Sequence, residues 1–397
     1  MRARASTRPL PFAATALTEL VPTSIPTVTA ASDCDQVCKL RQYGSVPSFP
    51  PTPPPADSET ARPALRILAT APLRGPGLDK LRRLGEVIHE PWIDQDPLRI
   101  YDAAGLAARA KEEGANVLVV ESDLLSGPVF DLPLLAVAAT RGDPTNVDVA
   151  AATAAGIPVL HAPGRNAEAV AELTVALLFA VTRRLVSADR DARTGQVFRD
   201  GTIPYQRFRA SELAGRTAGL VGLGAVGRAV RWRLRGLGMT VLANDPHSPD
   251  AHDPLDALTE CSDVVSLHAA VTRETLGMWD QKRFDAMKEG AVFLNTARAS
   301  LHDTDALVAS LASGHLGGAG LDHVDGEQLP DGHPLLEFPN VVVTPHIGGA
   351  TFESETRGTQ TIADDLERLV SGAAPLHIAN PEVLGPGGPE VHREVRA

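Results

Sequence analysis

The sequence predicts an α/β protein made of two doubly wound parallel sheets, and three observations predict it. Short aliphatic runs alternate with helical patterns from Leu65 onward, a glycine-rich turn joins one such run to a helix, and a long apolar helical pattern divides the alternation into two halves. Because parallel strands need crossover connections, strand–helix alternation of this kind indicates parallel sheets.

Composition sets the broad class of the protein. The chain has 397 residues, 43% of them hydrophobic and 22% charged, which suits a globular protein of two to three domains of roughly 150 residues each. A formal net charge of −12 disfavours binding to nucleic acid or to anionic lipid. No apolar run of membrane-spanning length occurs, so no membrane association is expected.

The three cysteines, Cys34, Cys38 and Cys261, do not make a disulfide framework, and a reducing cytoplasm is the expected location. The Cys34–Cys38 spacing lacks a second cysteine or histidine pair, so no metal site is predicted.

The two ends of the chain differ in composition from the rest. Residues 1–63 are rich in proline and alanine without apolar periodicity and are predicted to be a disordered extension. Their early arginines leave a transit peptide open as the alternative to a mere extension. Residues 385–397 are predicted to form a tail.

The first half of the alternation predicts a substrate domain with a flavodoxin-like sheet. Strands are expected at 65–70, 116–120, 134–139 and 157–161, with helices at 101–113 and 147–155. The amphipathic pattern at 351–371 predicts a helix that returns to this domain. The substrate domain is therefore predicted to be discontinuous, comprising residues 64–165 and 350–384.

The second half predicts an inserted dinucleotide-binding domain at residues 166–349. It should begin with one long helix over 166–194, because apolar residues recur there at helical intervals. Strands are expected at 218–221, 239–244, 264–267, 291–295, 318–321 and 341–344.

The turn after the first of these strands carries a complete G-x-G-x-x-G fingerprint of a Rossmann domain. Gly222 would permit the tight turn, Gly224 would let the backbone approach a pyrophosphate, and Gly227 would let the helix pack on the strand. The amides of Ala225 and Val226 would lie at the helix N-terminus, which attracts anions.

Asp245 follows the next strand, where a carboxylate can bind the adenosine ribose hydroxyls. It would repel a 2′-phosphate, and no arginine occurs within Asp245–Ser248 to neutralise one. NAD is therefore favoured over NADP as the cofactor.

Three later segments each place polar residues just beyond a strand, at the edge where doubly wound sheets bind ligands. They supply Arg298, Glu327 and His346. An arginine offers a planar fork for a substrate carboxylate, and a histidine titrates near neutrality. Glu327 is expected to orient and charge that histidine, so these three residues are the predicted catalytic set.

With these segments the chain resembles the D-isomer-specific 2-hydroxyacid dehydrogenases over roughly residues 65–384. The family's arginine, glutamate and histidine fall on the three predicted catalytic residues. Further family signatures match Asn146–Asp148, Pro163–Asn166 and Ala169–Glu172. The resemblance implies hydride transfer between NAD(H) and a small 2-oxo or 2-hydroxy acid. It also implies cofactor contacts from a set of residues on the later strands: Thr296, Ala297, Arg298, Asp322 and His346.

Several readings remain open. The expected substrate loop carries Glu121 and Asp123 where phosphoglycerate enzymes tend to carry arginine, which favours an unphosphorylated substrate. The particular 2-hydroxy acid and the physiological direction stay open. A homodimer is expected, formed through the helix at 166–194 and the arm at 195–209. The alternative class is an NAD-sensing corepressor-like interaction protein on the same fold.

Overall fold

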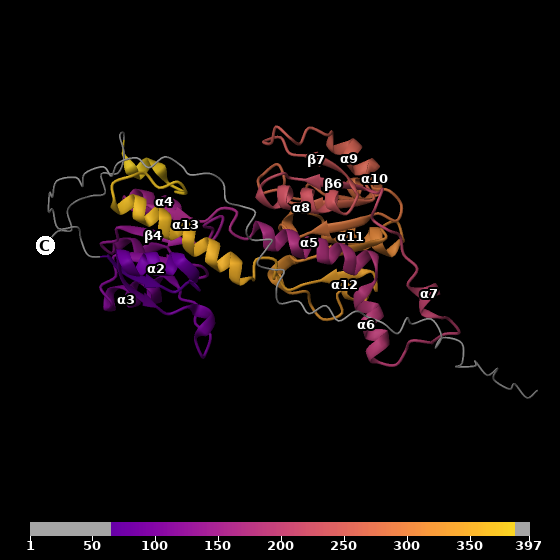
Figure 1. Ribbon diagram of the computed structural model, residues 1–397, viewed down its shortest axis with the longest axis horizontal. Coiled ribbons are helices and arrows are strands. Elements are labelled where there is room, and N and C mark those ends of the chain that lie inside the picture. The colour runs from indigo at the N-terminus through magenta and orange to yellow at the C-terminus, as the bar shows by residue number, and fades with distance from the viewer. Residues whose placement is uncertain (1–64, 386–397) are drawn as a thin grey trace, which may run out of the picture. The chain divides into compact units, whose positions relative to one another are not determined.

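The computed structural model describes residues 65–385. The predicted extension at 1–63 and the tail after Gly385 lie outside the described residues. Among the helices of residues 65–385, none combines the length and the apolar character that crossing a membrane requires. All paired strands in both sheets run parallel, as the alternation predicts (Figure 1).

The first sheet has five strands in the order β2-β1-β3-β4-β5, the flavodoxin-like order. They are β1 (Leu65–Ala69), β2 (Gly85–His89), β3 (Val117–Val120), β4 (Ala136–Ala139) and β5 (Val159–His161). Four match predicted strands. The edge strand β2 was not predicted, because its apolar run is only Val87 and Ile88, between Glu86 and His89.

Helices cover both faces of this sheet. They are α2 (Gly75–Leu84), α3 (Ala103–Glu112), α4 (Val149–Ala154) and α13 (Phe352–Val370), with short 3-10 turns η2 (Trp92–Asp94), η3 (Gly127–Asp131) and η6 (Pro381–Leu384). One apolar core lies under α2 and α13, and a second lies under α3 and α4.

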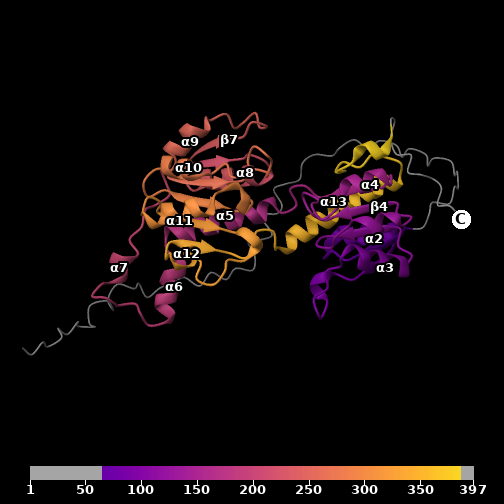
Figure 2. The same cartoon turned by 180° about the vertical axis from the view of Figure 1, so that it is seen from behind.

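The C-terminal helix α13 returns to the first sheet, as predicted, and lies against α2 (Figures 1 and 2). The two helices approach closely at Gly77, where an added Cβ would lie 2.7 Å from the backbone of Gln360. Lys80 bridges them with ion pairs of 2.7 Å to Asp364 and 2.8 Å to Glu367. The helical layer on this face of the sheet thus combines segments from both ends of the described chain.

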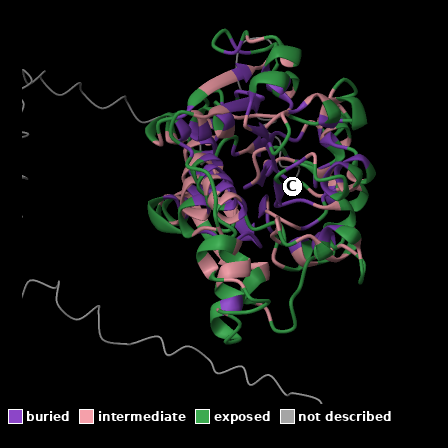
Figure 3. Ribbon diagram, turned by 90° about the vertical axis from the view of Figure 1, so that its right-hand side faces the viewer, coloured by how far each residue is buried: buried purple, intermediate pink, exposed green. Residues whose placement is uncertain are grey.

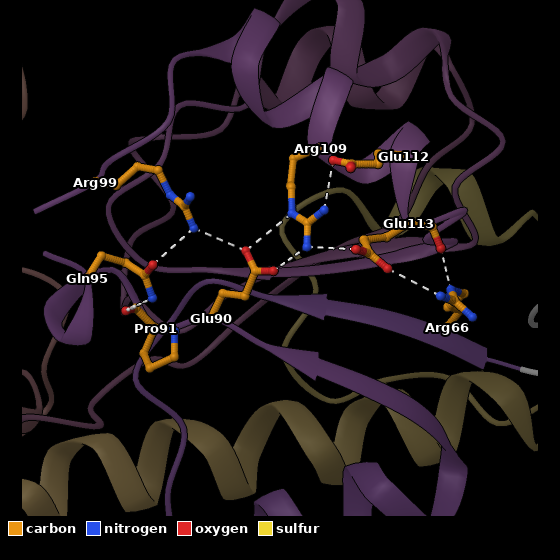
Figure 4. Close-up of polar contacts among 8 residues, drawn as sticks. All are labelled: Arg66, Glu90, Pro91, Gln95, Arg99, Arg109, Glu112 and Glu113. Atoms are coloured by element: carbon orange, nitrogen blue, oxygen red, sulfur yellow. Dashed lines mark hydrogen bonds and ion pairs between the residues drawn. The ribbon is translucent and has the colours of Figure 1, made fainter. Parts of the chain in front are cut away.

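A charged network ties β1, α3 and the segment after β2 together (Figure 4). Glu90 pairs with Arg109 and, at 3.1 Å, with Arg99, while Glu113 pairs with Arg109 at 2.6 Å and with Arg66 at 3.2 Å. The Arg109 guanidinium lowers the pKa of Glu90 below its usual value. The residues of this network belong to the strands, helices and loops of the first sheet's domain, and their ion pairs fix the C-terminal end of α3.

The second sheet has six strands in the order β11-β10-β9-β8-β6-β7. They are β6 (Thr217–Val221), β7 (Thr240–Asn244), β8 (Val264–Leu267), β9 (Val292–Asn295), β10 (Gly318–Leu321) and β11 (Val341–Val343). All six were predicted. In the usual Rossmann order a third strand lies outside the second. Here the segment after β7 makes only an isolated bridge, between Asn244 and His252.

Helices also cover both faces of the second sheet, over two separate apolar cores. They are α5 (Ala167–Thr182), α8 (Ala225–Gly236), α9 (Leu255–Cys261), α10 (Gln281–Ala286), α11 (Thr304–Ala312) and α12 (Pro334–Glu337), with turns η4 (Ala299–Leu301) and η5 (Asp325–Glu327). Two further helices, α6 (Leu185–Arg193) and α7 (Pro204–Arg207), follow α5 in the chain and contribute no residue to either core. Figure 3 shows the buried residues concentrated along the strands and on the helix faces that meet them.

The prediction of one helix over residues 166–194 was wrong, because the structure has two helices there. α5 ends at Thr182, and Arg184 adopts a left-handed conformation with φ of 52° before α6 begins. No glycine or proline marks the break in the sequence. The apolar pattern continues through Leu185 and Val186, but both side chains are about half exposed, so they do not extend the buried face.

Candidate active site

A cavity of about 420 Å³ lies where the carboxyl ends of strands from both sheets supply its walls. Its size falls within the range of small-ligand sites. Residues that follow β3, β4, β9, β10 and β11 line it, among them Glu121, Arg141, Arg298, His323 and His346. This is the edge at which doubly wound sheets bind ligands.

His346 and Glu327 meet across two loops. The Nδ1 atom of His346 lies 3.1 Å and 3.2 Å from the two carboxylate oxygens of Glu327. Both residues have left-handed backbones, with φ of 53° and 63°, a conformation that costs energy for residues other than glycine and occurs often at functional sites. With Nδ1 held by the carboxylate, the other ring nitrogen is left to exchange a proton with a ligand.

Asp322 holds the loop that carries His346. Its buried carboxylate accepts hydrogen bonds from the Thr344 hydroxyl at 2.6 Å and from the amides of Ile347 and Gly348 at 2.9 and 2.8 Å. The His346 amide donates to the Asp322 carbonyl at 3.0 Å. The structure thereby gives Asp322 a positioning role, and the cofactor contact predicted for it stays a prediction.

Arg298 follows β9 on a turn organised by Asn295. The Asn295 side chain donates to the Arg298 carbonyl at 2.8 Å and accepts from the Ala297 amide at 3.0 Å. The guanidinium donates to the Ala297 carbonyl at 2.6 Å. Within residues 65–385 no carboxylate lies within ion-pair distance of Arg298. Its charge is therefore free for an anionic ligand.

Thr296 lies in the same turn and is buried. Its hydroxyl is 2.8 Å from the hydroxyl of Thr174 on α5. That contact fixes the turn against the helix, on the wall of the cavity.

His323 is a site residue that sequence reasoning passed over. Its Nε2 lies 3.4 Å from Arg298 Nη1, and its ring centroid is 3.7 Å from that of His346. Burial, together with the charges of His346 and Arg298, lowers the pKa of His323 to about 4, so the ring is neutral near pH 7. One ligand atom from each of His323, Glu327 and His346 lies within 4.8 Å of the other two, a spacing that could hold a metal ion. The prediction of no metal site considered only the cysteine spacing and did not include this group.

The predicted substrate loop after β3 is only partly confirmed as cavity lining. Glu121 lines the cavity. Asp123 is fully buried and accepts hydrogen bonds from the Thr70 hydroxyl and, at 2.7 Å, from the Tyr101 amide. The Asp123 carboxylate therefore stabilises contacts between segments around the first sheet.

Two arginines of the cavity lining were not among the predicted site residues, Arg141 and Arg165. Arg165 forms an ion pair with Glu121. Arg141 lies two residues beyond β4 and reaches only the Glu121 carbonyl, at 3.5 Å. The rule that selected Arg298, a polar residue just beyond a parallel strand, would also have selected Arg141.

The glycine loop has the shape that a dinucleotide requires. Gly222 has a φ of 94°, and a Cβ there would lie 2.6 Å from the Ala269 amide nitrogen. A Cβ on Gly227 would lie 2.3 Å from the Gly222 carbonyl oxygen, whereas one on Gly224 would meet nothing within 4 Å. Gly224 thus faces open space at the N-terminus of α8, where the first-turn amides lack helical partners. These residues fit a bound pyrophosphate.

Asp245 lies immediately beyond β7, next to this loop. Its carboxylate accepts from the Leu223 amide at 2.7 Å and from the His247 amide at 2.8 Å. The nearby Arg228 is held by Asp250 at 2.7 Å and by the Ser248 hydroxyl at 2.9 Å. The carboxylate is therefore placed beside the cradle that the glycines form.

Comparison with known proteins decides the family. Residues 175–348 match the model of the D-isomer specific 2-hydroxyacid dehydrogenase, NAD binding domain. The glyoxylate reductase of Thermofilum pendens is 37% identical over 335 residues, covering 82% of this chain and 96% of that enzyme. The chain belongs to the D-isomer specific 2-hydroxyacid dehydrogenases.

A second relative and a solved structure are also similar to this chain. The D-3-phosphoglycerate dehydrogenase of Mycobacterium tuberculosis is 33% identical over 325 residues, which cover 79% of this chain and 58% of that enzyme. The crystal structure of the TT0316 protein from Thermus thermophilus superposes with a TM-score of 0.68 at 38% identity, covering 79% of this chain and all of that one.

Membership makes this dehydrogenase an NAD(H)-dependent oxidoreductase of the 2-hydroxyacid class. The predicted family, fold class and cofactor are confirmed. These similarities give no support to the corepressor-like alternative. The relatives differ in substrate, so the particular acid is a separate question.

Proposed function

We propose that this dehydrogenase reduces a small, unphosphorylated 2-oxo acid to the D-2-hydroxy acid with NADH, and catalyses the reverse oxidation. One observation carries the proposal: the guanidinium of Arg298, which has no carboxylate partner among residues 65–385, shares a cavity with His346, whose Nδ1 lies 3.1 Å from the Glu327 carboxylate. A fixed cation and an oriented histidine are what a 2-oxo acid needs at its carboxylate and at its carbonyl.

Each residue has a distinct role in the proposed reaction. The Arg298 fork binds the substrate carboxylate, and His346 donates a proton to the carbonyl oxygen, with Glu327 holding its ring. Asp322 keeps the histidine loop in place through its three hydrogen bonds. The nicotinamide of bound NADH supplies the hydride.

We further propose that the glycine loop holds the pyrophosphate and Asp245 the ribose. The loop comprises Gly222, Gly224, Ala225, Val226 and Gly227. Contacts near the nicotinamide are proposed for residues at the ends of β9 and β10 and after β11: Thr296, Ala297, Arg298, Asp322 and His346. All but Ala297 line the cavity.

A kinetic screen tests this function. Purified full-length protein is mixed with NADH and a panel of unphosphorylated 2-oxo acids, and absorbance at the NADH band is followed. We expect turnover of at least one of these acids to a product of D configuration. Turnover confined to phosphorylated acids would contradict the proposed substrate class, and failure with every 2-oxo acid would contradict the proposed function.

Cofactor preference gives a first specific prediction. We expect NADH to exceed NADPH by at least about tenfold in kcat/KM, because the Asp245 carboxylate repels a 2′-phosphate. Asp245→Ala should reduce that ratio about tenfold or more. The ratio is informative even if the variant loosens the loop, since looseness affects both cofactors. Asp331→Ala, at an exposed acid away from the cavity, is the control. Equal use of both cofactors by the parent would contradict the assignment.

Assembly gives a second prediction. The arm at 195–209 exposes Phe198 and Tyr205, each 76% accessible, which is unusual for aromatic side chains on a monomer. We propose a cytoplasmic homodimer that covers them. Light scattering at micromolar concentration should give twice the chain mass of 41.8 kDa, and the double change Phe198→Ser, Tyr205→Ser should give monomer. A monomeric parent would refute this arrangement.

A further inference from the structure

The proposed reduction of a 2-oxo acid with one carboxylate assigns no role to Arg141. It lines the same cavity as Arg298 and is partly buried. The one hydrogen bond its side chain makes among residues 65–385 is a long one, from Nη1 to the Glu121 carbonyl at 3.5 Å. Across that same part of the chain, no carboxylate comes within ion-pair distance of it.

The neighbouring Arg165, unlike Arg141, has an ion-pair partner and a structural role. Arg165 and Glu121 have side chains only 12% and 15% accessible and form an ion pair. Trp92 also donates to the Glu121 carboxylate, at 3.2 Å. Glu121 is therefore engaged with other partners, which leaves Arg141 uncompensated.

A partly buried cation without an ion-pair partner is costly. Burial, with the like charges of Arg298 and Arg165, lowers the pKa of Arg141 from its usual value, and the carboxylates of Glu121 and Asp143 only partly oppose this. A partly desolvated charge is normally retained where something pairs with it. Two unpaired guanidinium groups around one cavity call for a ligand with two anionic groups.

We propose that Arg141 forms a second anion subsite, which selects 2-oxo acids that carry a second carboxylate. The inference rests on the proposed function, since Arg298 must bind the first carboxylate. A single guanidinium fork matches one carboxylate bidentately. The carboxylate of Asp143, whose charge acts on Arg141, disfavours the second negative charge of a phosphomonoester. The substrate class is thus a short 2-oxo dicarboxylate.

Matched substrate pairs test the subsite. Oxaloacetate and 2-oxobutanoate have the same chain length and differ in one terminal carboxylate, as do 2-oxoglutarate and 2-oxopentanoate. The parent should prefer the dicarboxylate of at least one pair by about tenfold or more in kcat/KM, since hydrogen bonds to charged groups contribute about 1.5–3 kcal/mol.

Variants of Arg141 then assign the preference to this side chain. Arg141→Gln should lower kcat/KM for the dicarboxylate about 10- to 100-fold and change that for the monocarboxylate by less than about threefold. Arg141→Lys should recover part of the loss, because it keeps the charge but not the fork. Arg83→Gln removes one exposed positive charge from α2 and should change neither value.

Each of these kinetic results would overturn the subsite: a parent that does not distinguish the pairs, an Arg141→Gln variant that loses both substrates alike, or a preference for 3-phosphohydroxypyruvate over every dicarboxylate. Calorimetry measures the binding of succinate and of butanoate to the NADH-loaded protein without turnover, so it tests the subsite independently of the reaction. Absence of turnover on all 2-oxo acids refutes the proposed function. Equal binding of succinate and butanoate, in parent and variant, refutes the subsite.

Discussion

Replacing His346 with alanine is expected to lower kcat by about 10²- to 10⁴-fold, the usual contribution of a positioned proton donor. NADH binding should be nearly unchanged, because the histidine acts only as charge develops on the carbonyl oxygen. Stopped-flow measurement of a single turnover gives the rate, and NADH fluorescence gives the affinity.

A loss of turnover in this variant can be assigned to the missing imidazole, because the loop around His346 should stay folded. Asp322 holds that loop mainly through the amides of Ile347 and Gly348 and the Thr344 hydroxyl, none of which the substitution removes. The variant should therefore melt close to the parent temperature. Near-parental turnover in a folded variant would show that the proton comes from another group.

Replacing Arg298 with lysine is expected to lower kcat/KM by about 10²-fold, because a small displacement of the reacting atoms has an effect of that size. Lysine keeps the positive charge but loses the planar fork, so the substrate carboxylate is held less well and KM should rise while kcat falls.

Arg298→Ala removes the charge as well and should be worse than lysine. Steady-state kinetics on the best 2-oxo acid, with NADH saturating, separates the two parameters. The hydrogen bonds that organise this turn, between Asn295 and the Arg298 and Ala297 backbones, do not involve the guanidinium. Unchanged KM in both variants would mean that the carboxylate binds elsewhere.

Much of this fold could be predicted because the signals were local. A buried parallel strand is expected to be a near-continuous apolar run, and β6, β8, β9 and β10 of the second sheet are almost entirely buried. The glycine loop was predictable for a steric reason, since added side chains at Gly222 and Gly227 would collide with backbone. The edge strand β2 was missed because its apolar run is only Val87 and Ile88, between Glu86 and His89.

The parts that sequence missed depend on contacts between distant segments. The break between α5 and α6 lies at Arg184, whose left-handed backbone has no sequence signature. The positioning role of Asp322 needs the loop after β11 to fold back onto β10. His323 and Arg141 each lie two residues beyond a strand, so the strand-end rule could have selected them, but only the structure shows that they line one cavity.

Deuterium transfer tests most directly whether hydride passes from NADH to the carbonyl carbon of the substrate. The full-length protein is incubated with NADH dideuterated at nicotinamide C4 and with the best 2-oxo acid from the screen, and the product is analysed by proton NMR and chiral chromatography. We expect a 2-hydroxy acid of D configuration with one deuterium at C2, because hydride should pass directly from the nicotinamide to the carbonyl carbon. A product without deuterium at C2, or one of L configuration, would contradict it.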